Sequence, residues 1–178
     1  MHFALGGLRV PIESVLDFSQ TYEPIDQVAR LRMMTGAAVQ QVSWRKLRTT
    51  LSGAGWWPAG LDALNFDAAL VLDCAAPRSI TSASNVIMLP PARRTDTDYL
   101  PVGYALVLPA GGAARFDTVL VPTPLALAGD TATLTAVSGA VAYQATYYPR
   151  LNVFADRPQA ETDIAAAQHR WTLTAEEI

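Results

Sequence analysis

Few residues in this sequence have the types and spacing of a catalytic nucleophile. The best candidate serine is Ser52, in the segment LSGAG at 51–55. A nucleophilic hydrolase also requires a base that a third group orients, and only His2 and His169 are present to supply one. Ser52 does not occupy a G-x-S-x-G elbow. We therefore expect a turn serine, surface histidines and no catalytic residue.

The sequence also has few residues that could form a metal or phosphate site. One cysteine and two distant histidines give no zinc spacing. Asp96 and Asp98 resemble the opening of a calcium loop, but the glycine at the sixth position and the glutamate at the twelfth are absent. Gly111 and Gly112 precede no pattern that predicts a helix able to receive a phosphate. We expect no metal and no cofactor, and no pair of carboxylates is singled out for glycoside hydrolysis.

The most unusual feature is the pair Trp56 and Trp57, which lies in a glycine-rich loop before Pro58. Adjacent residues of an extended segment point to opposite sides, so one indole can enter the core while the other stays exposed. Three interpretations remain open for the pair: a carbohydrate-stacking platform, an anchor between subunits, or two buried side chains.

A basic cluster formed by Arg45, Lys46 and Arg48 follows Trp44. Phosphate neutralisation with aromatic stacking is how proteins hold single-stranded nucleic acid. Edge strands also carry Lys and Arg to prevent unwanted pairing, and we favour such a solvated or interface strand. The interface residues predicted from the sequence are Trp44, Arg45, Arg48, Trp56 and Trp57.

Composition favours assembly over nucleic-acid binding. Hydrophobic residues make up 51% of the chain and charged residues 16%, against roughly 25% charged in ordinary domains. A partner that covers part of the surface would explain the shortage of charge. The net charge of -3 gives no general attraction for a polyanion. No apolar run approaches the roughly 20 residues of a membrane span, and no signal peptide is apparent, so we expect a protein that stays in the cytoplasm or leaves it by lysis.

Short strand-like runs separated by Gly, Pro, Asn and Asp dominate the sequence. The clearest unit is a hairpin of residues 28–34 and 37–51 around Gly36, with a bulge near Arg45 and Lys46. Residues 68–72 predict a fully buried strand that ends at a buried Cys74. Further strands are expected at 79–89, 104–108, 116–121, 151–154 and 171–174, with a second hairpin of 131–137 and 140–148; Pro58 could open a helical turn that reaches Leu64.

The fold class that these patterns predict is all-β, mainly an antiparallel β-sandwich or barrel-like fold, with one short helix near the C-terminus. The helix is expected at 158–168, where an alanine run follows acidic residues. We expect a single domain over residues 1–178. Paired prolines and a polar stretch mark a possible boundary between two lobes near 90–98.

The order of several motifs resembles that of small tail or baseplate proteins of temperate, long-tailed bacteriophages. The similarity covers nearly the whole chain and is carried by these segments: FSQTYEP at 18–24, RLRMMTG at 30–36, QVSW at 41–44, SGAGW at 52–56, LPPARRTD at 89–96, YYPRL at 147–151 and WTLTAEEI at 171–178. Trp57 and the alanine-rich segment near Ala165 depart from the pattern. The resemblance implies a virion component of the distal tail.

The resulting hypothesis is a non-enzymatic structural protein of the tail or baseplate that forms a ring or adaptor. Its expected partners are other copies of itself and neighbouring phage tail proteins, with no nucleic acid and no membrane span. Its expected location is the virion tail, and the host cytoplasm during assembly. The alternative is a receptor- or carbohydrate-binding module that recognises a host surface glycan through Trp56 and Trp57. A cell-wall hydrolase is the third hypothesis.

Overall fold

The computed structural model describes residues 3–108 and 118–178 of the chain. This part is 60% strand, the strands are mostly antiparallel, and it contains no helix of seven residues or more. The all-β prediction is confirmed. The chain forms two compact units: unit 1 comprises residues 1–76 and 151–178, and unit 2 comprises residues 77–150. Unit 2 is therefore inserted into the sequence of unit 1.

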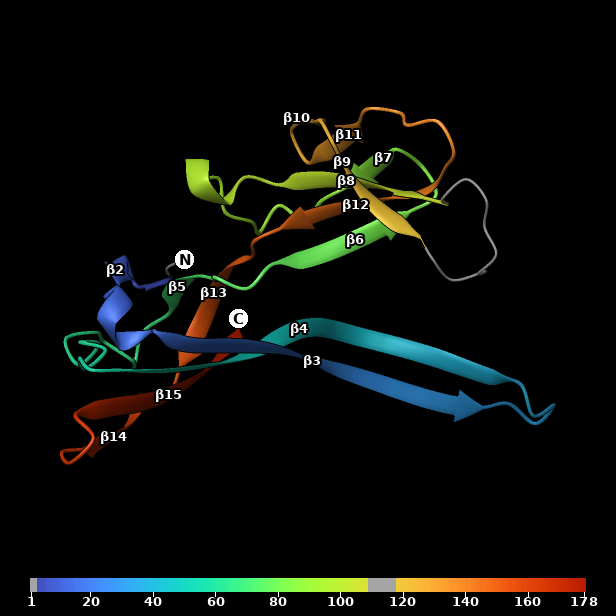
Figure 1. Ribbon diagram of the computed structural model, residues 1–178. Coiled ribbons are helices and arrows are strands. Elements are labelled where there is room, and N and C mark those ends of the chain that lie inside the picture. The colour runs from blue at the N-terminus through green and yellow to red at the C-terminus, as the bar shows by residue number, and fades with distance from the viewer. Residues whose placement is uncertain (1–2, 109–117) are drawn as a thin grey trace. The chain divides into compact units, whose positions relative to one another are not determined.

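Unit 1 is built on one twisted sheet with the strand order β2-β1-β5-β13-β15-β4-β3, to which β14 adds by pairing with β15. A 3-10 turn, η1 (Ile12–Ser14), precedes β3. The strands are β1 (Ala4–Leu5), β2 (Leu8–Arg9), β3 (Asp17–Arg32), β4 (Ala38–Gly55), β5 (Leu70–Asp73), β13 (Arg150–Ala155), β14 (Gln159–Asp163) and β15 (Gln168–Glu177). In Figure 1, β3 and β4 continue well beyond the other strands of this sheet.

The core of unit 1 lies on one face of the sheet. Alternate residues of β4, β13 and β15 are buried there, as the period of two along a strand requires. Trp171 packs on Phe3, with ring centroids 5.5 Å apart, and its ring fills the place that a Cβ on Gly53 would need. Cys74 is fully buried in this core, as the sequence predicts.

Unit 2 has two small sheets that share a core. One has the order β6-β12-β8-β9 and the other β10-β11-β7. Buried residues of both sheets, including Ala105, Leu134 and Tyr143, form a single cluster, so the unit is sandwich-like. Its elements are β6 (Arg78–Ser82), β7 (Val86–Met88), η2 (Thr97–Tyr99), β8 (Val102–Val107), β9 (Val119–Thr123), β10 (Leu125–Ala128), β11 (Thr131–Leu134) and β12 (Ala140–Tyr147).

The helix predicted at 158–168 is wrong. Residues 159–163 form β14 and pair in register with β15, and the alanine run makes only the turn between them. Asp163 Oδ1 accepts hydrogen bonds from the backbone N–H groups of Ala165 and Ala166, at 3.0 and 3.1 Å. So short a segment gains little from helix propensity, because nucleation is costly. Strand pairing and the aspartate turn decide the structure.

The first predicted hairpin is confirmed and is longer than expected. β3 and β4 pair from Asp17 with Ala54 to Arg32 with Ala38, and Gly36 has a φ of +81° in the turn. The bulge falls at Ser43, because Gln27 pairs with Trp44 and Val28 with Val42. The bulge therefore lies two positions before Arg45, near which it was expected.

Three other local predictions are corrected. Residues 131–137 and 140–148 do not form a hairpin, since β11 pairs with β10 and β7 while β12 pairs with β6 and β8. The expected single strand at 79–89 is two strands, β6 and β7, in different sheets. β5 is not fully buried, because Val71 is exposed.

Pro58 starts no helix, and the segment makes only a turn in which Leu64 N–H bonds to Leu61 O. The expected strand at 116–121 begins at Val119, and residues 116–117 lie outside the described residues, as do Gly111, Gly112 and His2.

The segment 90–98, considered as a boundary between lobes, lies inside unit 2. Arg93 forms a bridge to Pro149, and the Arg94 N–H bonds to Tyr148 O at 2.8 Å. The two units instead meet in sequence at 76–77 and 150–151. The single domain over 1–178 stays a prediction, because two compact units of one chain can still unfold together.

Candidate functional site

The most unusual surface of unit 1 is the far half of the β3–β4 hairpin, residues 24–47, which we call the ribbon. β15 pairs with β4 only between Arg48 and Gly55. Within the described residues, the ribbon strands therefore pair only with each other. Every residue from Ala29 to Arg45 is exposed among the residues that the structure describes. A two-stranded ribbon of this kind is marginally stable in water by itself.

The two faces of the ribbon differ in their side chains, because the charged residues Arg30, Asp26 and Arg45 lie on one face and Trp44 lies on the other. Cross-strand partners stand on the same face, and successive residues alternate between faces. One face carries Leu31 opposite Val39 and Gln27 opposite Trp44. The other face continues the core-facing side of the sheet and carries Arg30 opposite Gln40 and Asp26 opposite Arg45, with Val28 and Val42 between them.

The hairpin turn adds two exposed methionines at the tip of the ribbon. Leu31 is 61% exposed, Met33 is 57% exposed, and Met34 is fully exposed. Methionine is flexible and polarisable, so it adapts to irregular partner surfaces. The ribbon therefore offers an apolar, adaptable end that no described residue covers.

Trp44 and Arg45 lie on the ribbon, on opposite faces. Trp44 is exposed, and its Nε1 donates a hydrogen bond of 3.1 Å to Oε1 of Gln27, its partner on the neighbouring strand. The predicted placement of both residues on a surface strand agrees with the structure. Their role at an interface stays a prediction.

Arg48 lies beyond the ribbon, where β4 is flanked by β3 and β15. Its Nη1 is 3.3 Å from Glu23 Oε2 and its Nη2 is 2.6 Å from Glu176 Oε1. The hydrogen bond and charge of Glu176 raise the pKa of Arg48, with a smaller contribution from Glu23. Both carboxylates satisfy the guanidinium within the chain, so it is less available to a partner than Arg45 is.

Trp56 and Trp57 are both exposed, at 62% and 60%. Of the three interpretations that the sequence leaves open for the pair, two buried side chains is excluded by this exposure. The stacking platform and the subunit anchor stay open. The preceding strand end is buried, because Gly55 lies so close to Glu13 O that a Cβ there would be 1.8 Å from it. The chain turns outward immediately after this contact, and both indoles face solvent.

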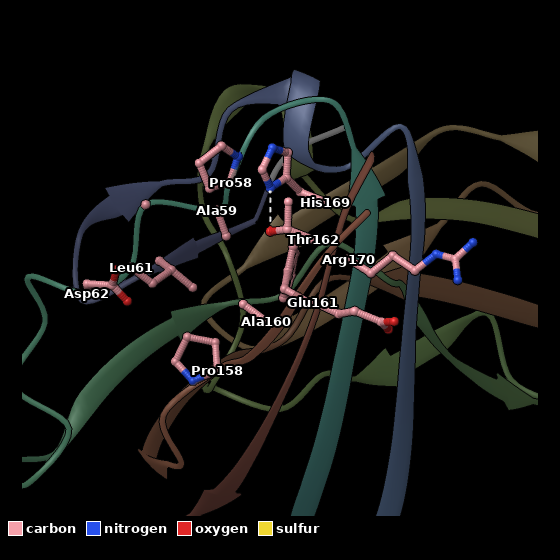
Figure 2. Close-up of a pocket in the computed structure, with 12 residues that line it drawn as sticks. Pro58, Ala59, Leu61, Asp62, Pro158, Ala160, Glu161, Thr162, His169 and Arg170 are labelled. Atoms are coloured by element: carbon pink, nitrogen blue, oxygen red, sulfur yellow. Dashed lines mark hydrogen bonds between the residues drawn. The ribbon is translucent and has the colours of Figure 1, made fainter. Parts of the chain in front are cut away.

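A small pocket lies beside the same loop, between residues 58–62 and the β14–β15 hairpin (Figure 2). Thr162 Oγ1 and His169 Nδ1 are 3.0 Å apart at its wall, and Asp62 and Glu161 are also among its lining residues. The cavity holds about 80 Å³, whereas ligand pockets hold about 300 Å³ or more. It is too small for a substrate of ordinary size.

The other candidate chemical residues are dispersed. Ser52 lies in β4, and its Oγ is 3.2 Å from Ser19 Oγ rather than from a histidine. Asp96 accepts hydrogen bonds from Arg94, at 2.9 Å from Nε and 2.7 Å from Nη2. Among residues 3–108 and 118–178, no group of three His, Cys, Asp or Glu side chains is arranged to hold a metal ion.

Sequence reasoning missed Arg30, Leu31, Arg32, Met33 and Met34 as surface candidates. A signal was present in the sequence, because an arginine flanks Leu31 on each side and two methionines precede the turn. The same pattern is also typical of a half-buried strand, since a strand with one apolar face usually packs on a core. The exposure of these residues in the structure is what identifies the segment as a surface.

Comparison with known proteins identifies no family. No family model matches the sequence, and no curated protein is significantly similar to it. None of the described helical segments is long and apolar enough to cross a membrane.

Proposed function

We propose that this chain is a non-enzymatic assembly protein that binds its neighbours through the ribbon. The observation that carries the proposal is that residues 24–47 project beyond the sheet with apolar side chains exposed on both faces. Exposed apolar surface next to charged residues is typical of protein-binding sites. A ribbon that gains a covering layer on binding also gains the stability that it lacks alone.

The resemblance to bacteriophage tail and baseplate proteins supports a place in the virion tail. A tail is assembled from repeated subunit contacts, and a low content of charge with a long projecting hairpin suits such contacts. In this proposal the protein forms a ring or adaptor with copies of itself and neighbouring tail proteins. Mass spectrometry of purified virions tests the location, and absence of the protein from intact particles would refute it.

Replacement of apolar ribbon residues tests the binding role. The variant Leu31→Ser with Val39→Ser removes a cross-strand apolar pair from the ribbon face that also carries Trp44. We expect association, measured by sedimentation velocity with the purified chain or by incorporation into virions, to weaken by about tenfold or more. The matched control is Val86→Ser with Leu127→Ser, which changes exposed apolar residues of unit 2. Equal effects of the two double variants would refute the role of the ribbon.

A second candidate function is glycan binding through Trp56 and Trp57, which the exposure of both indoles favours. Aromatic faces free of neighbours can stack on sugar rings, although adjacent residues of an extended loop do not form one flat platform. A glycan array tests this function. Saturable binding that Trp57→Ala abolishes and Trp44→Ala leaves unchanged would favour it over assembly.

A further inference from the structure

Two uncovered surfaces lie at opposite ends of the same β3–β4 hairpin. The first is the tip surface, which consists of Arg30, Leu31, Arg32, Met33 and Met34. The second is the end groove, an open groove of about 400 Å³ where β3 begins and β4 ends. The end groove is lined by Leu16, Asp17, Ala54, Trp56, Ala166 and Gln168, among others.

The ribbon and the rest of unit 1 carry opposite net charge. The ribbon has four basic residues and one acidic residue, a formal net charge of +3. The rest of unit 1 has four basic and eleven acidic residues, a formal net charge of -7. Asp17 lines the end groove. Glu13 is an exposed residue of η1 whose backbone carbonyl packs against Gly55, another residue of the groove lining. Opposite charges of this size steer association and select orientation.

The apolar side chains of the two surfaces also match. The tip surface presents Leu31, Met33 and Met34, all more than half exposed. The end groove presents Leu16 and Trp56, at 55% and 62% exposure. A methionine can adapt to such a groove, and a tryptophan near the centre of a contact commonly contributes much of its energy. The tip surface thus combines apolar side chains with two arginines, and the end groove combines apolar side chains with the carboxylate-bearing Asp17.

The two surfaces of one molecule cannot meet each other. β3 runs for 16 residues from Asp17 at the end groove to Arg32 at the tip, and a strand of that length spans about 50 Å. β4 runs back over the same distance, so the hairpin cannot fold onto its own base without breaking its pairing. A contact between the two surfaces therefore requires a second molecule.

We infer that the tip surface of one copy docks into the end groove of a second copy, so that the chain associates head to tail. The inference rests on the proposed assembly function and names the partner of the ribbon. Each copy donates one tip and accepts one, which is a heterologous contact that continues into a ring or a filament. A second copy is favoured over an unrelated acidic protein because both complementary surfaces are present in unit 1.

Charge reversal and rescue test the docking. The tip variant is Arg30→Glu with Arg32→Glu, and the groove variant is Glu13→Lys with Asp17→Lys. We expect each to weaken self-association of the purified full chain at least about tenfold in sedimentation equilibrium, and the combined variant to recover it, because the charges are again opposite. The control variant, Arg9→Glu with Arg157→Glu, makes the same charge change as the tip variant at exposed residues away from the ribbon.

The contact is supported if self-association is weak in the tip variant and in the groove variant but is recovered in the combined variant. Weaker self-association of the wild type at high salt also supports it. A combined variant that stays as weak as the single-surface variants would overturn it. A wild-type chain that is monomeric at high concentration would also overturn it, even if the chain is found in virions. In that case Leu31→Ser with Val39→Ser still tests whether the ribbon binds a different tail protein, so the assembly function can survive the loss of this inference.

Discussion

The indole Nε1 of Trp171 donates a hydrogen bond of 2.9 Å to the backbone carbonyl of Ser14, across 157 positions of sequence. Ser14 is fully buried, and its own hydroxyl donates to Pro58 O at 2.9 Å. One serine thus joins η1, the loop after β4, and strand β15. These bonds fix the end of the sheet at which the exposed loop of Trp56 begins.

Replacement of the indole is the direct test of that arrangement. We expect Trp171→Phe to lower the free energy of unfolding by about 2 to 3 kcal/mol, because the Ser14 carbonyl loses its partner and the core loses volume. Urea denaturation measures the change. Trp56→Phe, at an exposed indole, is the matched control and should change stability little; equal losses for both variants would contradict the structure.

Gly55 is a second point at which the same end of unit 1 is fixed. A Cβ at Gly55 would lie 1.8 Å from Glu13 O, which is backbone and cannot move aside without displacing η1. We expect Gly55→Ala to cost about 3 kcal/mol or more. Gly7→Ala is the control: Gly7 has φ +82° and nothing within 4 Å of its Cβ position, so it pays only a backbone cost of about 1 to 2 kcal/mol. Thermal unfolding ranks the two, and the reverse order would refute the steric argument.

Arg94 stabilises the loop between β7 and β8 in unit 2. Its side chain is 2% exposed, its Nη2 is 2.7 Å from Asp96 Oδ2, and its Cζ lies 3.3 Å from the centroid of the Tyr99 ring. We expect Arg94→Lys to destabilise unit 2 by about 2 kcal/mol, because lysine keeps the charge but not the two-pronged hydrogen bonding or the stacking. Chemical denaturation measures it. Arg48→Lys, at an exposed ion pair, should have a clearly smaller effect.

The raised pKa of Tyr147 predicts that the free energy of unfolding of unit 2 decreases at alkaline pH. Burial raises the pKa of Tyr147, and the charge of Arg78, which is its cross-strand partner, opposes this in part. The folded state therefore prefers the neutral phenol. The stability that this preference contributes is fully present below the unfolded pKa of about 10 and is lost as the pH rises through the higher folded value. Tyr147→Phe should lose less stability above pH ~10 than the wild type. Parallel decreases in the two proteins would contradict the assignment.

Hydrogen exchange tests whether the ribbon is only marginally stable in the monomer. We expect amides of residues 25–46 to exchange at least about a hundredfold faster than those of residues 48–55 in the monomer, because the former have one partner strand and no core. Association should slow exchange in the ribbon. Equal protection of both segments in the monomer would mean that the ribbon is stable without a partner.

The sequence was sufficient for features that local chemistry determines. Alternation and turn residues predicted the β3–β4 hairpin, and Gly36 marked its turn. The apolar run before Cys74 predicted its burial. These features depend on residues close in sequence, for which periodicity and turn preference are informative.

Features that depend on distant pairing were not predictable in the same way. The alanines near Ala165 favour a helix by propensity, but β15 supplies a full set of strand partners to Gln159–Asp163. Likewise, β11 and β12 are separated by a glycine turn, yet each finds its partners elsewhere. The exposure of the ribbon follows from the end of β15 pairing at Arg48, and a local stretch of sequence does not show where a distant strand stops pairing.

The insertion of unit 2 between β5 and β13 sets an order of events during synthesis. β5 leaves the ribosome before residues 77–150, but its neighbour in the sheet, β13, and the next strand, β15, follow them. Unit 2 is continuous in sequence and can fold as soon as it emerges, whereas the first 76 residues must wait for the last 28. Until β15 arrives, the buried half of β4 is paired with β3 but lacks its second neighbour, so a nascent chain that is cut short would expose one edge of the strand from which the ribbon projects.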